Sequence, residues 1–157
     1  MKKQILNSLT TAFFLSLVIF MSCGGGSGGD DEPTISEREL QFDRLAKTWT
    51  VSSAQADGNP IEGWDALTIT FGGTATSGSF STNGQQPDGT TRVWPTSGTW
   101  NFVSETDLNT ITRSDGIEIT LGVDNAGTTA TLNFEIPTDG GRQDVVEGRW
   151  RFELTSN

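Results

Sequence analysis

The chain has 157 residues, with 10 Lys and Arg, 20 Asp and Glu, one Cys and no His. Without His there is no imidazole base and no His-ligated metal, and a single Cys permits neither an internal disulfide nor a thiolate zinc site. A formal charge of −10 repels phosphate backbones, so we expect no nucleic-acid partner.

Residues 1–22 are predicted to be a secretory signal peptide. Lys2 and Lys3 give a positive start, and Ala12 to Met21 is an apolar run interrupted by Ser16. A membrane-spanning helix needs about 20 apolar residues, and this run is too short for that. Removing the segment leaves eight basic and 20 acidic residues, a formal charge of −12.

Cys23, the chain's one thiol, follows Ser22 and precedes a glycine-rich run. This arrangement resembles the lipobox of bacterial lipoproteins, in which the Cys becomes the lipidated first residue of the mature chain. The resemblance implies an exported protein anchored to the cell envelope through lipid on Cys23, at the outer membrane, with the membrane face left open. The alternative is an ordinary signal peptide with an incidental Cys.

Residues 23–35 are predicted to form a flexible tether, because Gly/Ser-rich chains behave as coils. Beyond it, Ser36 and Glu39 form a capping-box pattern ahead of Leu40, Phe42 and Leu45. This pattern predicts a short helix over about residues 37–46.

From Trp49 onward the apolar residues alternate with period two, which is typical of strands with one buried face. Turn-forming pairs such as Asn83-Gly84 and Asp115-Gly116 separate the strands. We expect eight strands, around Trp49–Val51, Leu67–Phe71, Ala75–Ser81, Trp100–Phe102, Leu108–Arg113, Ile117–Val123, Ala130–Ile136 and Trp150–Leu154. No crossover helix is predicted, so the expected fold is an all-β, antiparallel up-and-down barrel preceded by the helix; a β-sandwich is the alternative.

A short helix followed by Leu45-Ala46-Lys47-Thr48-Trp49 and an eight-strand meander is similar to the lipocalin-like domains of bacterial lipoproteins, over residues 36–157. Trp49 stands at the Trp of the lipocalin Gly-x-Trp motif, with Lys47 in place of the Gly. The resemblance implies a barrel that binds a small apolar or amphipathic ligand at its open end.

Loop lengths give the expected barrel a direction. Alternate loops of a meander emerge at the same end, and those near 56–65, 83–96 and 137–146 are long. This end, which we call the mouth end, is the candidate binding region, since loops on a rigid scaffold carry function. The helix should plug the opposite end, where the tether also attaches, so the mouth should face away from the membrane.

Two of the five Trp residues, Trp64 and Trp94, lie in these loops beside charged residues. Their rings are expected either to meet a ligand or to fold back and seal the barrel. Arg142 is expected either to bind an anionic head group or to be solvated. The candidate ligand-binding residues are Trp64, Asp65, Asp88, Arg92, Trp94 and Arg142.

Three functions stay open at this point. The first is a lipid-anchored binding protein for a small apolar ligand. The second is a surface lipoprotein whose loop end binds carbohydrate or protein, and the third is a structural lipoprotein with a filled barrel. The interior of an eight-strand barrel is wide enough to be filled by side chains or to hold one small ligand. A filled barrel and a ligand-binding barrel therefore both agree with the strand pattern. We expect a monomer, no cofactor, no metal and no enzymatic activity.

Overall fold

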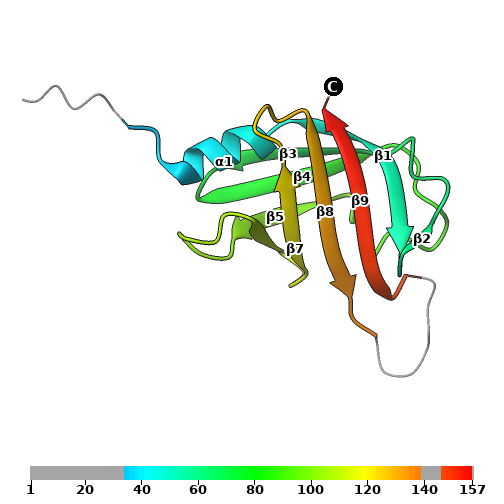
Figure 1. Ribbon diagram of the computed structural model, residues 1–157. Coiled ribbons are helices and arrows are strands. Elements are labelled where there is room, and N and C mark those ends of the chain that lie inside the picture. Colours follow the sequence, from blue (N-terminus) through cyan, green and yellow to red (C-terminus); the bar gives the residue numbers. More distant parts are fainter. Residues whose placement is uncertain (1–33, 139–145, 157) are drawn as a thin grey trace, which may run out of the picture. The chain divides into compact units, whose positions relative to one another are not determined.

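The computed structural model describes residues 34–138 and 146–156, which form a helix and one antiparallel sheet closed into a barrel (Figure 1). The predicted barrel is therefore confirmed, and the alternative of a β-sandwich is wrong. The predictions on residues 1–33, including Cys23, and on Arg142 lie outside the described residues.

Helix α1 (Glu37–Leu45) begins where the capping box predicted. The Ser36 hydroxyl accepts from the backbone N–H of Glu39, and the Glu39 carboxylate accepts from the backbone N–H of Ser36 at 2.9 Å. Each contact satisfies a backbone donor at the helix start. Among residues 34–138 and 146–156, no helix is long and apolar enough to cross a membrane.

The sheet contains eight main strands and one short one. They are β1 (Thr48–Ala56), β2 (Asn59–Pro60), β3 (Thr68–Thr74), β4 (Ser77–Asn83), β5 (Ser97–Phe102), β6 (Thr110–Arg113), β7 (Glu118–Val123), β8 (Thr129–Ile136) and β9 (Gly148–Ser156). The two-residue β2, which the sequence did not predict, pairs with the end of β1 as a hairpin arm. The remaining strands pair in chain order.

The barrel closes where β1 pairs with β9. The register runs from Trp49 opposite Ser156 to Ala56 opposite Trp150, with a bulge between Val51 and Ser53. Closure matters because it gives the backbone of the first and last strands partners and so removes the exposed edges that invite further strand pairing.

Inward-facing side chains are apolar and rich in aromatic rings. Burial alternates along β8 and β9, as the period-two pattern predicted. Aromatic rings contact one another inside the barrel: Phe134 stacks on Phe152 with centroids 5.9 Å apart, and Trp100 meets Phe102 edge to face at 5.2 Å. The buried aromatic residues are Trp49, Trp64, Phe71, Phe80, Trp94, Trp100, Phe102, Phe134, Trp150 and Phe152.

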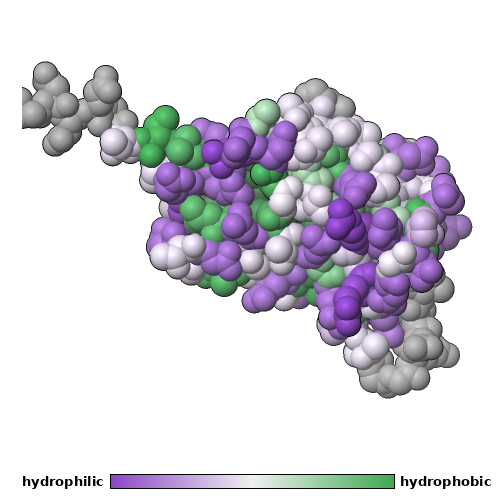
Figure 2. All heavy atoms as spheres, in the orientation of Figure 1, coloured by the Kyte–Doolittle hydropathy of each residue, from purple (hydrophilic) through white to green (hydrophobic). Residues whose placement is uncertain are grey.

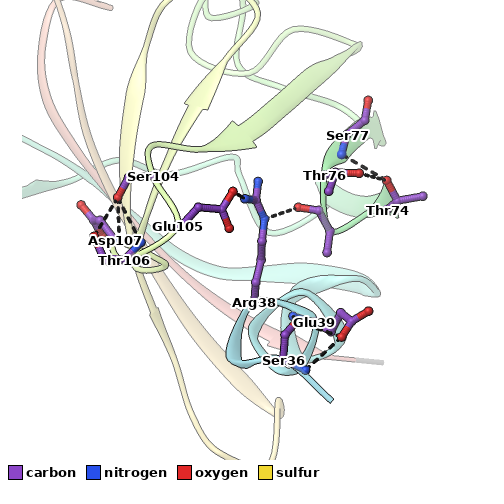
Figure 3. A network of polar contacts seen from close by, with 11 residues as sticks. Ser36, Arg38, Glu39, Thr74, Thr76, Ser77, Ser104, Glu105, Thr106 and Asp107 are labelled. Carbon is purple, nitrogen blue, oxygen red and sulfur yellow. Dashed lines mark hydrogen bonds and ion pairs between the residues drawn. The ribbon is translucent and has the colours of Figure 1, made fainter. Parts of the chain in front are cut away.

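Arg38 on helix α1 reaches the turns at the end of the barrel opposite the long loops (Figure 3). Arg38 donates to the carbonyl of Ala75 at 2.8 Å, pairs with Glu105 and lies over the Phe102 ring. Phe42 stacks on Trp100 at 6.1 Å. Because Ala75 and Glu105 belong to turns at that end, these contacts place the helix as the predicted plug.

Gly78 on β4 lies against the ring of Trp100, so a substitution at Gly78 tests the packing at the helix end of the barrel. An added Cβ at Gly78 would lie 2.1 Å from the indole, whereas at Gly122 on β7 it would meet only ordinary contacts at 3.7 Å. Gly78→Ala should lower the free energy of unfolding by about 1–3 kcal/mol, the usual cost of overpacking. Gly122→Ala should leave it unchanged or raise it, since alanine restricts the unfolded chain more. Urea titration followed by Trp fluorescence measures both, and equal losses would contradict this packing.

Candidate functional site

Three connections and one turn join the strand ends at the mouth end of the barrel. They join β1 to β3, β4 to β5, and β8 to β9, together with the turn between β6 and β7. At the helix end the connection from β5 to β6 spans residues 103–109, and the connections from β3 to β4 and from β7 to β8 are shorter.

Trp94, from the β4–β5 connection, is inserted into the barrel and is fully buried. Its ring lies 5.8 Å from Phe80 on β4 and 5.7 Å from Phe134 on β8, nearly perpendicular to both. It also lies 6.4 Å from Phe71 on β3 and 6.0 Å from Phe152 on β9. Since these strands belong to opposite walls, Trp94 occupies the centre of the lumen.

Trp64 closes the mouth beside it. Its ring meets Phe152 at 4.9 Å and Trp150 at 5.6 Å and is 1 % exposed. The alternative that the loop tryptophans fold back to seal the barrel is therefore what the structure shows. The indole N–H groups of Trp64 and Trp94 are buried without a hydrogen-bond acceptor in the described residues, which costs about 1–3 kcal/mol each.

Arg113 on β6 holds the Trp94 loop from inside the barrel. Its guanidinium donates to the carbonyl of Val93 at 2.6 Å and lies 5.1 Å from the Trp94 ring centroid. It also donates twice to Asp115, at 3.0 and 2.5 Å, and lies over the Phe134 ring. A desolvated cation over an aromatic face contributes about 0.5–2 kcal/mol. We call Arg113, Asp115 and Trp94 the mouth clasp.

Asp115 neutralises the buried cation from the rim of the barrel. Partial burial of its carboxylate raises the pKa, but the hydrogen bond and positive charge from Arg113, with a backbone hydrogen bond from Ile117, outweigh that effect and leave the pKa below its usual value. The Asp115 carboxylate therefore remains ionised at neutral pH and supplies the negative charge that a buried guanidinium requires.

Sequence reasoning missed Arg113, although the signal was present. Alternation along β6 puts Ile111 and Arg113 on the same inward face, so a charged residue stands at a core position. A buried charge must be paired, and Asp115 lies two residues away. That combination was enough to mark the position as special.

A pocket of about 360 Å³ remains open beside the clasp. Its apolar wall comes from Pro95, Ile117, Ile136 and Pro137, and its polar groups are Thr91, Arg92 and Asp115. Its lining comes from the β4–β5 connection, the β6–β7 turn and the end of β8. We call it the mouth pocket; its volume falls within the usual range for small-ligand sites.

The structure separates the other predicted site residues. Arg92 lines the mouth pocket, whereas Asp65 lines a different pocket of about 220 Å³ beside Trp64 and β1. Asp88 is exposed on the β4–β5 connection and lines neither pocket. Of the six predicted residues, Arg92 and Trp94 therefore lie closest to one common site, the first on the pocket and the second in the clasp.

Within the part of the chain that the structure describes, no three acidic or thiol side chains gather in a group able to hold a metal ion. A comparison with known protein families and a search of curated proteins found no match for this chain.

The pKa of Asp115 makes the clasp sensitive to acid. Its folded pKa lies below the unfolded value of about 3.9, so the stabilisation is complete well above pH 4 and is lost as the pH falls through the folded pKa. The unfolding free energy of wild type should therefore exceed that of Asp115→Asn at pH 6, and the gap should narrow toward pH 3.

Urea titrations of both proteins at each pH measure this gap. Glu39, Asp124 and Glu153 also have lowered pKa values, because hydrogen bonds reach each carboxylate, so the difference between two proteins is the informative quantity. Asp88→Asn, on the loop itself, should have little effect on stability at pH 6. A gap that stays constant from pH 6 to pH 3 would contradict the proposed contribution of Asp115.

Proposed function

We propose that the protein is a lipid-anchored lipoprotein of the cell envelope whose lipocalin-like barrel binds a small amphipathic molecule at its mouth end. The observation that carries the proposal is the mouth pocket, which joins an apolar wall to charged groups at the end where the long loops meet. Signal peptide, lipidated Cys23 and tether come from the sequence pattern alone.

The burial of Trp64 and Trp94 moves the proposed site out of the lumen. Both rings pack among inward-facing aromatic residues, so an incoming ligand would have to displace them. The mouth pocket requires no such rearrangement. The ligand is therefore expected to rest on the closed barrel rather than inside it.

The charges of the mouth pocket favour an anionic head group. The Asp115 carboxylate accepts from Arg113 in two hydrogen bonds, which offsets its charge. Arg92 is the basic residue of the lining. A ligand carboxylate near Arg92 would place its apolar part against Pro95, Ile117 and Ile136.

A structural lipoprotein without a small ligand is the second candidate. The observation that favours it is the packed lumen, because an aromatic-filled barrel is a stable scaffold whether or not it binds anything. The two candidates differ in whether the mouth pocket is ever occupied.

Dansyl-labelled undecanoic acid, a fluorescent anionic amphiphile, distinguishes them. Protein beginning at Gly24 should bind the probe saturably at one site, and Ile117→Glu should weaken binding at least about tenfold, equivalent to 1.4 kcal/mol, by placing a carboxylate on the apolar wall. Val103→Glu is the matched control, since Val103 is an exposed apolar residue at the helix end. Arg92→Ala should weaken binding of the acid but not of its methyl ester.

Absence of saturable binding, or equal loss in Ile117→Glu and Val103→Glu, would contradict the mouth site and favour the structural candidate. Lipid attachment at Cys23 is tested by supplying labelled palmitate to cells that express the full-length protein. The label should enter the full-length wild type and be absent from Cys23→Ala, and a labelled variant would count against lipidation at this residue.

A further inference from the structure

A third depression, of about 480 Å³, lies on the outside of the barrel across β7, β8, β9 and β1. These strands lie side by side on the face shown in Figure 1. One row of paired residues crosses all four strands: Thr120 on β7, Asn133 on β8, Arg151 on β9 and Gln55 on β1. We call this depression the outer groove.

The shape of the outer groove follows from side-chain length. Thr120 and Asn133 are short, while Glu118, Glu135 and Arg149 stand beside them toward the mouth end. Phe134 and Trp150, which point inward, also contribute to its lining. The aliphatic stem of Arg149 adds further apolar surface below its charged head. The groove thus combines a partly apolar lining with a rim of polar groups.

The polar groups of the groove remain available for a ligand. Within residues 34–138 and 146–156, no hydrogen bond is formed by the side chains of Gln55, Glu118, Thr120, Asn133, Glu135 or Arg149, although the backbone N–H of Arg149 donates to Asp57. Arg151 differs, because it pairs with Glu153 at 2.9 Å, and Glu153 also accepts from Ser53. In Figure 2, which has the same orientation, this face is largely hydrophilic.

The groove is balanced in charge on an acidic protein. Glu118 and Glu135 offset Arg149 and Arg151, whereas the whole chain carries a formal charge of −10. The groove therefore offers guanidinium donors, carboxylate acceptors, two amides that both donate and accept, and a hydroxyl. Sugar hydroxyls also donate and accept, so this mixture suits a polyhydroxylated ligand without selecting a charged one.

The closed barrel disfavours a peptide in the outer groove. An extended peptide gains much of its affinity by adding a strand to a free sheet edge. Here β9 pairs with β8 on one side and with β1 on the other, along the length of the groove. A ligand must then be held by side chains alone, as a glycan is.

From this geometry we propose that the outer groove binds a neutral glycan. The site is independent of the mouth pocket, shares no lining residue with it, and differs from a carbohydrate site on the loop end. Thr120 and Asn133 lie under the sugar ring, and the Arg149 and Glu135 side chains bond to its hydroxyls.

Affinity electrophoresis of the full-length protein in gels containing dextran, mannan, xylan or acidic alginate tests the proposal. At least one neutral polysaccharide should retard the wild type relative to a polysaccharide-free gel. Thr120→Arg, which fills the groove, should abolish the retardation, and Asn133→Ala, which removes an amide without adding bulk, should reduce it. Circular dichroism verifies that each variant is folded.

Ser81→Arg is the matched control, since Ser81 is an exposed residue on β4, away from the groove, and the substitution adds the same charge and bulk. It should be retarded as strongly as wild type. Three results would overturn the proposal: no retardation by any of the neutral polysaccharides, retardation by alginate alone, or equal loss in Thr120→Arg and Ser81→Arg.

Discussion

The buried guanidinium of Arg113 is the constraint on which the mouth end depends. A cation removed from water requires compensation on every side, and few arrangements supply it. Here the compensation comes from the Asp115 carboxylate, the Val93 carbonyl and the faces of the Trp94 and Phe134 rings. Two of these groups belong to the β4–β5 connection, so satisfying the charge also fixes that connection inside the barrel.

Fixing the connection decides what the barrel can do. Trp94 takes the centre of the lumen and Trp64 covers it, so binding has to occur on surfaces rather than in an interior cavity. The helix end is closed by a comparable device, in which Arg38 joins α1 to the Ala75 carbonyl and to Glu105. With both ends closed, the mouth pocket and the outer groove are the concave surfaces to which we assign function.

The fold could be predicted from sequence because its signals are local. The capping box at Ser36 and Glu39 and the alternation along β8 each depend on residues a few positions apart. The two-residue β2 could not be predicted, since it depends on pairing with the end of β1. The direction taken by the loop tryptophans was also beyond the sequence, because an aromatic residue in a loop has the same local pattern whether it points outward or inward. The burial of Trp94 follows from the four aromatic rings around it, one each from β3, β4, β8 and β9, and from the charge of Arg113 on β6.

Both loop tryptophans lie inside the barrel, and fluorine NMR of protein labelled with 5-fluorotryptophan tests this burial. Five resonances are expected, and Trp64→Phe and Trp94→Phe assign the two that matter. A buried fluorine shows no shift between H₂O and D₂O. No solvent isotope shift is expected for the resonances of Trp64 and Trp94, as for those of Trp49, Trp100 and Trp150, because all five side chains are buried. A clear shift for Trp94 would place its ring in solvent, leave the lumen open to a ligand and contradict the closed mouth.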